Sequence, residues 1–241
     1  MTTRMNEAGA SQRRLLVINP NTNRTISARV QSESEKIADT NTAITVVNPE
    51  FGPLSIETAE HRSEAVPLVI SLAESSLSAG YDAYALACFD DIGLFEVRRM
   101  AGVPVVGPCE AGIAAARTVA ERFTIVTTVH SAVPGIKKLI ERYGVSDICT
   151  VRAAGIGVAA AAAGNEATEE IVLKTIKEAI ELDGAQAIVL GSGGLTGSAL
   201  SFSQRAGVPV IDAVMAAVKM AEGLASMRSI SRRYLDSAVP G

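Results

Sequence analysis

Short apolar segments alternate with longer amphipathic segments along most of the chain, and this alternation limits the possible folds more than any other feature. The amphipathic segments have the spacing of helices with one buried face. Most of the apolar segments are continuously apolar, which is typical of strands buried on both faces. The expected strands cover residues 15–19, 44–47, 82–87, 103–106, 123–127, 187–190 and 208–211. The alternation predicts an α/β fold with parallel sheets flanked by helices.

Two blocks of the sequence occur twice. GYDAYALAC at residues 80–88 is matched by GAQAIVLGS at 184–192, and AGVPVV at 101–106 is matched by AGVPVI at 206–211. In both pairs the second copy follows the first at nearly the same distance along the sequence. Chance recurrence of a frequent turn sequence is therefore a poor explanation. We expect two similar lobes related by a pseudo-twofold axis, with the active site in the cleft between them. The expected boundaries are a flexible lead-in at 1–14, a first lobe at 15–112 plus 212–241, and a second lobe at 113–211.

The composition argues against several classes of protein. A net charge of −4 and an isoelectric point near 5.4 disfavour nucleic acid or an anionic membrane as a partner. Three cysteines without a CxxC pair, and only two histidines, disfavour a zinc site or a disulfide scaffold. No apolar run is long enough to span a bilayer, and the first residues lack a signal-peptide core. We expect a cytoplasmic protein that acts on a small molecule and binds no metal.

The duplication also predicts where a ligand binds. In open parallel sheets, ligands bind beyond the carboxyl ends of the strands. If two such sheets face each other, their strand ends border one cleft. Cys88 and Ser192 follow equivalent strands, so they should reach one substrate from opposite faces. The other residues expected at the cleft are Asn19, Pro20, Asn21, Phe89, Asp90, Thr127, Thr128, Gly193 and Gly194.

Cys88 is the candidate base. A free cysteine is most often a small buried apolar residue, and we expect this role for Cys109 and Cys149. Cys88, however, stands where an expected strand gives way to a helix, and N–H groups at a helix N-terminus lower the pKa of a thiol. A thiolate can remove a proton from carbon. For Asp91 we favour the explanation of a carboxylate at the N-terminus of that helix. For Asp90, this explanation and a ligand role are both open.

The polar cluster NPNTN at residues 19–23 ends the first expected strand. Pro20 stops the strand, and the Asn and Thr side chains can cap the helix that begins near residue 24. Because the cluster exceeds what a cap requires, we expect its side-chain amides to bind a polar ligand as well.

The loop GSGGLTG at residues 191–197 has two interpretations. A dinucleotide-binding loop would use Asp212 for the ribose, but the final glycine of that motif is missing and the following helix is short. We favour a loop whose backbone amides approach and stabilise a ligand oxygen.

Six segments together resemble the hydantoin and allantoin racemases of the aspartate/glutamate racemase superfamily. They are INPNT at 18–22, ACFDDxGL at 87–94, PVVGxxEA at 104–111, TT at 127–128, GSxG at 191–194 and VPVID at 208–212. The similarity covers nearly the whole chain after residue 14, and the combination of the first two segments is specific.

The resemblance implies a cofactor-independent enzyme with one catalytic cysteine in each of two facing lobes. One thiolate removes the proton of the chiral carbon, and the other thiol delivers a proton to the opposite face. The first family cysteine corresponds to Cys88. The resemblance also implies a homo-oligomer and, for allantoin as the substrate, a role in purine catabolism.

The second family cysteine corresponds to position 192, which is serine in this chain. A serine hydroxyl hardly ionises near neutral pH without a partner base. The intact flanking pattern favours an engineered Cys-to-Ser replacement that traps substrate, and a natural one-cysteine member is the alternative. A single-cysteine relative, arylmalonate decarboxylase, keeps the cysteine of the second lobe instead. A malonate decarboxylase and a non-catalytic ureide-binding protein are therefore the rival functions.

The sequence thus predicts a racemase of a five-membered cyclic ureide, either allantoin or a 5-monosubstituted hydantoin. Cys88 acts on one face of carbon C5, and position 192 acts on the other. The ring is anchored by Asn19, Asn21, Thr127 and Thr128, and its enolate-like carbonyl is held by the amides of Phe89, Asp90, Gly193 and Gly194.

Overall fold

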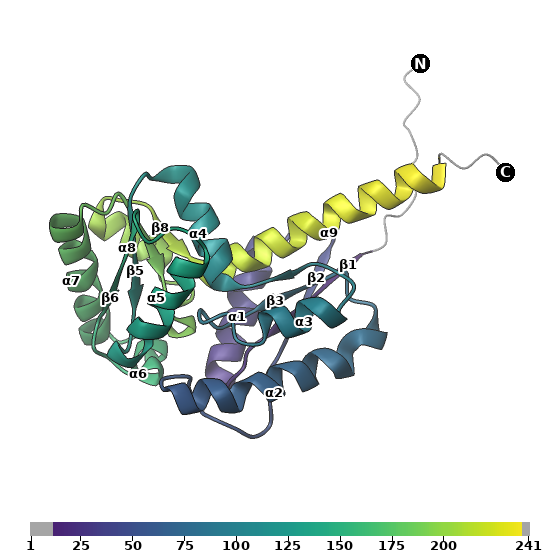
Figure 1. Ribbon diagram of the computed structural model, residues 1–241, viewed down its shortest axis with the longest axis horizontal. Coiled ribbons are helices and arrows are strands. Elements are labelled where there is room, and N and C mark those ends of the chain that lie inside the picture. Colours follow the sequence, from purple (N-terminus) through teal and green to yellow (C-terminus); the bar gives the residue numbers. More distant parts are fainter. Residues whose placement is uncertain (1–11, 238–241) are drawn as a thin grey trace, which may run out of the picture.

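The computed structural model describes residues 12–237, which form two α/β lobes (Figure 1). Each lobe has a four-stranded parallel sheet. The first sheet has the order β2-β1-β3-β4, with β1 (Arg13–Ile18), β2 (Thr42–Val47), β3 (Ala83–Leu86) and β4 (Val105–Val106). The second has the order β6-β5-β7-β8, with β5 (Phe123–Thr127), β6 (Cys149–Ala153), β7 (Ala187–Leu190) and β8 (Val210–Asp212). The same order recurs, so the predicted α/β class with two similar lobes is confirmed.

Helices cover both faces of each sheet. The helices between the strands of the first sheet are α1 (Arg24–Ile37), α2 (Ala59–Ser76), the short 3₁₀ helix η1 (Leu77–Ala79) and α3 (Leu94–Met100). From the end of β4 onward they are α4 (Pro108–Val119), η2 (His130–Ala132), α5 (Val133–Arg142), α6 (Val158–Ala163), α7 (Glu166–Asp183), η3 (Gly193–Leu195), α8 (Ala199–Ala206) and α9 (Ala213–Ser237).

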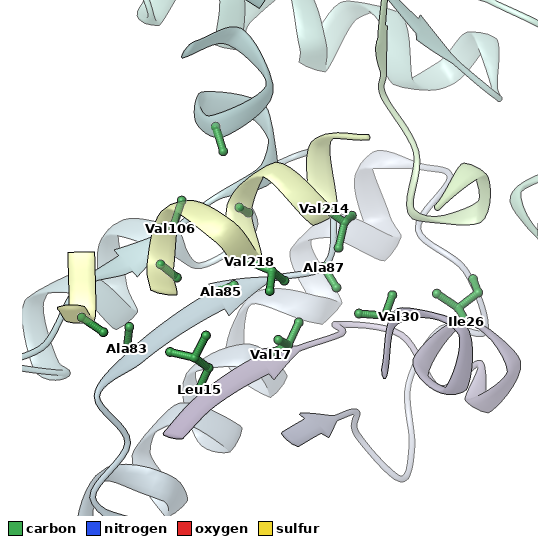
Figure 2. Packing of buried hydrophobic residues seen from close by; sticks show 14 of the residues in the cluster. Leu15, Val17, Ile26, Val30, Ala83, Ala85, Ala87, Val106, Val214 and Val218 are labelled. Carbon is green, nitrogen blue, oxygen red and sulfur yellow. The ribbon is translucent and has the colours of Figure 1, made fainter. Parts of the chain in front are cut away.

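The core of the first lobe is built from small aliphatic side chains. Figure 2 shows Val214 and Val218 of α9 packed over Val17 of β1 and Ala85 of β3. The alanines of β3 let α9 lie close to the sheet, so a core almost without aromatic residues still fills its volume. The helix α9 follows β8 of the second lobe but packs on the first sheet, so it carries the chain back to the first lobe (Figure 1).

One strand was not expected from the sequence. The strand β6 pairs only with β5 at the edge of the second sheet, and most of its side chains are half-exposed. Because one side of an edge strand faces solvent, its sequence CTVRA carries a charged residue and lacks the apolar run of the buried strands.

The predicted lead-in at 1–14 falls mostly outside the described residues. Its last two residues are nevertheless part of β1, and this expectation was wrong for them. Arg13 is fixed by a side-chain hydrogen bond to Thr42 and an ion pair with Asp39, so two charged residues extend the apolar strand. Among the helices of residues 12–237, none is both long and apolar enough to cross a membrane.

Candidate active site

A small cavity of about 30 Å³ lies where the carboxyl ends of the two sheets meet. The loops that follow β1, β3, β5 and β7 all contribute to its wall. Nine of the expected residues line it: Asn21, Cys88, Phe89, Asp90, Thr127, Thr128, Ser192, Gly193 and Gly194. The topology therefore brings together residues that are up to 173 positions apart in the sequence, between Asn21 and Gly194.

Cys88 and Ser192 occupy equivalent places in the two lobes. One residue separates Cys88 from the end of β3, and one residue separates Ser192 from the end of β7. Both side chains border the same cavity. The loops that carry them are in close contact, because a Cβ atom on Gly193 would lie 3.0 Å from the carbonyl oxygen of Ala87. The arrangement thus presents one thiol and one hydroxyl to a shared space.

The hydrogen bonds around these two residues are also equivalent. The backbone N–H of Asp90 donates to the sulfur of Cys88. The backbone N–H of Gly194 donates to Oγ of Ser192 over 3.3 Å. In both lobes, the amide two residues further along stabilises negative charge on the reactive atom. These two amides are therefore committed to positions 88 and 192, and we no longer expect them to hold a substrate carbonyl.

Thr128 gives Ser192 a second donor. Its hydroxyl donates to Oγ of Ser192 over 3.3 Å, and Thr128 is fully buried. The hydroxyl of Thr127 donates to the carbonyl oxygen of Gly191 over 2.9 Å and fixes the start of the same loop. Both groups that hydrogen-bond to Oγ among the described residues are donors, so neither can take the proton of Ser192.

The expected lowering of the Cys88 pKa is wrong. Burial raises the pKa of the thiol well above its usual range, and the carboxylates of Asp90 and Asp91 raise it further. The helix α3 begins only at Leu94, so its N-terminus does not directly follow the cysteine. The Asp90 amide and the Arg62 guanidinium favour the thiolate but do not outweigh burial.

Asp90 lines the cavity and is held by an ion pair that the sequence did not suggest. Arg62 of α2 donates from Nε to Oδ2 of Asp90 over 2.6 Å. Burial raises the pKa of the Asp90 carboxyl, while Arg62 opposes this shift. One oxygen of Asp90 thus stays bound to Arg62, and the other, Oδ1, has no hydrogen bond within the described part of the protein.

The loop after β1 presents one amide group to the cavity. Oδ1 of Asn21 accepts hydrogen bonds from Nδ2 of Asn19 (3.1 Å) and from the backbone N–H of Asn23 (3.0 Å). These two donors fix the orientation of the Asn21 amide. Its Nδ2 has no acceptor among the described residues, so it is free to donate to a substrate carbonyl.

Asn19 and Pro20 are not part of the cavity wall. Asn19 is fully buried behind Asn21, and its Nδ2 also donates to Ser27. The carbonyl and amide of this side chain organise the loop, so Asn19 supports Asn21 rather than facing the cavity. Asn23 caps α1 by accepting from the backbone N–H groups of Thr25 and Ile26, as the turn interpretation expected.

Asp91 caps the N-terminus of α4 rather than that of α3, the helix that directly follows it in the sequence. Its carboxylate accepts from the backbone N–H groups of Cys109 and Glu110 in the first turn of α4. It is buried and has a φ of 50°, in the left-handed region. Aspartate tolerates this region better than most residues. Asp91 therefore ties the Cys88 loop to the helix that leads into the second lobe.

Sequence reasoning missed the apolar part of the wall. These side chains come from α1, the segment before α2, the loop around η2 and the start of α6: Ile26, Ile56, Val129, Ala132 and Val158. Nothing in their local sequence distinguishes them from ordinary core residues. Only the docking of the two lobes makes them neighbours. No group of three metal-binding side chains converges anywhere within the described residues.

The chain matches the family model described as Asp/Glu/Hydantoin racemase over residues 15–221. The chain belongs to this family. It is 38% identical to a hydantoin racemase from Rhizobium meliloti, over 86% of this chain and 87% of the relative.

Two solved structures have the same architecture. One is an allantoin racemase from Klebsiella pneumoniae, with a TM-score of 0.86 and 35% identity over 89% of this chain and 88% of that one. The other is an allantoin racemase from Pseudomonas fluorescens, with a TM-score of 0.83 and 31% identity over 89% and 91% of the two chains. The family membership and these relatives identify the chain as a racemase, and hence an isomerase.

Proposed function

We propose that this racemase acts on a five-membered cyclic ureide, allantoin or a 5-monosubstituted hydantoin. One observation carries the proposal: Cys88 and Ser192 follow equivalent strands of the two lobes, and both line the same cavity. Relatives named for hydantoin and for allantoin are similar to this chain over most of its length. Such rings have an acidic carbon between a carbonyl and a nitrogen, which two groups on opposite faces can deprotonate and reprotonate.

Cys88 is the proposed base. Its thiolate takes the proton from C5, and the electron pair of the C–H bond moves into the adjacent carbonyl to give an enolate. Nδ2 of Asn21 and the backbone N–H groups of Phe89 and Gly193 are available to stabilise the developing negative charge. Oδ1 of Asp90 is available to accept from a ring N–H.

Ser192 is the proposed replacement for the second cysteine. Because Thr128 and Gly194 both donate to its oxygen, its own proton is free to point into the cavity. The hydroxyl can hydrogen-bond to a substrate but is a poor proton shuttle near neutral pH. We therefore propose that the chain with Ser192 binds substrate and exchanges its proton on the Cys88 face, while inversion is slow. A Cys-to-Ser replacement that traps substrate would give this behaviour.

The charge of the wall supports a neutral ring over a malonate. Asp90 is the only charged side chain among the described residues that line the cavity, and the nearby Arg62 is paired with it. A dicarboxylate would face this carboxylate without a cation of its own, so decarboxylation of a malonate is disfavoured. The predicted cytoplasmic location, homo-oligomer, cofactor independence and purine catabolism stay predictions.

The decisive experiment follows deuterium incorporation and optical rotation separately. Single enantiomers of allantoin and of 5-methylhydantoin are incubated with enzyme in heavy water. For the chain with Ser192, we expect deuterium at C5 only in the enantiomer whose C–H bond faces Cys88, with little change of its circular dichroism signal. For Ser192→Cys, we expect that signal to decay. Cys88→Ala should abolish both.

Two outcomes would count against the proposal. Absence of deuterium incorporation with both substrates and in both forms of the enzyme would contradict proton abstraction from a cyclic ureide. Release of carbon dioxide from a phenylmalonate would instead support the rival lyase.

A further inference from the structure

We propose that Glu57 and Arg29 are positioning residues of the active site, because together they hold α6 against the cavity and behind the Ser192 loop. Both residues belong to the first lobe, whereas α6 lies between β6 and α7 of the second lobe. Only one part of this proposal rests on the proposed function, namely that the substrate binds in this cavity.

The helix α6 cannot hold this position by itself. It has six residues with the sequence VAAAAA, so no side chain of its own can form a polar contact. Helices this short are unstable in isolation. Gly157 precedes it and Gly164 follows it in the left-handed conformation, and neither provides a side-chain cap. Its place in the structure must come from neighbouring elements.

Glu57 binds the start of α6 from across the cleft. Its Oε1 accepts the backbone N–H of Val158 over 2.9 Å. The backbone of Glu57 is also tied to the second lobe, because Oγ of Ser131 donates to its carbonyl oxygen. The neighbouring Ile56 lines the cavity. The same segment therefore contributes one wall and secures another.

Arg29 binds the other end of α6. From α1, it donates through Nη2 to the carbonyl oxygen of Ala162 over 2.6 Å and through Nη1 to that of Gly194 over 3.5 Å. A carboxylate at the first N–H and a guanidinium at the last carbonyls both match the polarity of the helix ends. Arg29 also connects α6 directly to the loop that carries Ser192.

The position of α6 matters for the site in two ways. Val158, its first residue, is part of the cavity wall. Gly194 lies directly against α6, since a Cβ atom there would be 2.7 Å from the carbonyl oxygen of Val158. Gly194 in turn donates to Ser192. A displaced α6 would open the wall and remove the support behind the reacting group.

Apolar packing complements these polar contacts. Val158 and Ala162 belong to the buried cluster that contains Ile26 and Val30 of α1, and Figure 2 shows these two α1 side chains at one end of that cluster. The helix is thus docked on the first lobe while it is covalently part of the second.

Hydrogen–deuterium exchange of the backbone amides tests the proposal without relying on activity. The variants are Glu57→Ala and Arg29→Ala, with Glu57→Gln and Arg29→Lys as conservative replacements that keep an acceptor or a cation. Glu64→Ala and Arg24→Ala are matched controls, because both side chains are exposed. Glu64 lies on α2, which directly follows the Glu57 segment, and Arg24 lies on α1 together with Arg29. We expect the peptides covering residues 155–164 and 192–196 to exchange about tenfold faster in the two alanine variants.

The rest of the protein should keep its protection, the conservative variants should recover part of it, and the controls should match the parent. Unchanged exchange in 155–164, or an equal increase across the whole chain, would overturn the assignment. A second measurement uses racemisation in the Ser192→Cys background, where we expect Arg29→Ala to lower kcat by about tenfold and Arg29→Lys to restore most of it. If Ser192→Cys itself is inactive, the proposed function fails while the exchange experiment still decides the role of α6.

Discussion

Tyr143 and Asp91 form a hydrogen bond of 2.7 Å that joins the two lobes next to the candidate active site. Asp91 lies in the loop that carries Cys88, and Tyr143 ends α5 of the second lobe. Asp91 also caps α4, so one buried carboxylate connects the Cys88 loop, the crossover helix and the far lobe. The geometry of the cleft therefore depends on contacts outside the cavity wall.

We expect Tyr143→Phe to destabilise the protein by about 1–3 kcal/mol, because it leaves a buried carboxylate oxygen with one donor fewer. Chemical denaturation of the parent and the variant measures this difference. Tyr81→Phe is the matched control. Within the described residues the Tyr81 hydroxyl has no hydrogen-bond partner, and the residue is only half-buried. Equal stability losses in the two variants would argue against a specific role for the Tyr143 hydroxyl.

The Asp91 carboxyl should also make stability depend on pH. Burial raises its pKa to about 7, whereas an unfolded aspartate has a pKa near 3.8. The folded state therefore binds this proton more tightly than the unfolded state. The free energy of unfolding should fall as pH rises from about 4 to about 7 and then level off. The full effect is roughly 4 kcal/mol.

In Asp91→Asn this contribution disappears, so the free energy of unfolding should lose this downward slope between pH 4 and 7. Denaturation at pH 5 and pH 8 for both proteins gives the comparison. A parent and a variant with the same pH dependence would show that Asp91 does not titrate in this range.

Gly107 leaves room for the Asp91 carboxylate at the start of α4. A Cβ atom at this position would lie 2.3 Å from Oδ1 of Asp91, so Gly107→Ala must displace the capping residue. We expect a loss of about 2–4 kcal/mol in the free energy of unfolding. Gly223→Ala is the control: nothing lies within 4 Å of its Cβ position in α9, and alanine there should stabilise the helix by about 0.5–1 kcal/mol. Similar effects of the two substitutions would contradict the packing argument.

The raised pKa of the Cys88 thiol predicts a strong pH dependence of its reactivity. At neutral pH only a small fraction is thiolate, so alkylation by iodoacetamide should accelerate about tenfold per pH unit through pH 9. Asp90→Asn should increase the rate at a given pH, because the Asp90 carboxylate raises the pKa of the thiol. Mass spectrometry of the labelled peptide separates Cys88 from the buried Cys109 and Cys149. A plateau near pH 7 would show that the thiol has a low pKa after all.

Much of the architecture was predictable because it depends on local patterns. Continuous apolar runs such as residues 123–127 and 187–190 identify strands buried on both faces, and the repeated blocks identify two similar units. The carboxyl ends of parallel strands meet at one edge, so the positions of Cys88 and Ser192 in a common cleft followed from the repeat. The edge strand β6 escaped detection, because its sequence CTVRA contains a charged residue and has no continuous apolar run, unlike the other edge strand β2.

The sequence by itself determined the fold class, the duplication and the two strand ends that carry the reactive side chains. Tertiary structure alone decided the ionisation of Cys88, since its pKa depends on burial and on carboxylates fixed by Arg62 and by the first turn of α4. It also decided that Asn19 supports the site from behind, that Asp91 caps a distant helix, and that Glu57 and Arg29 hold α6. Periodicity and motifs record how each segment meets its own neighbours, whereas these contacts arise only when the two lobes pack face to face.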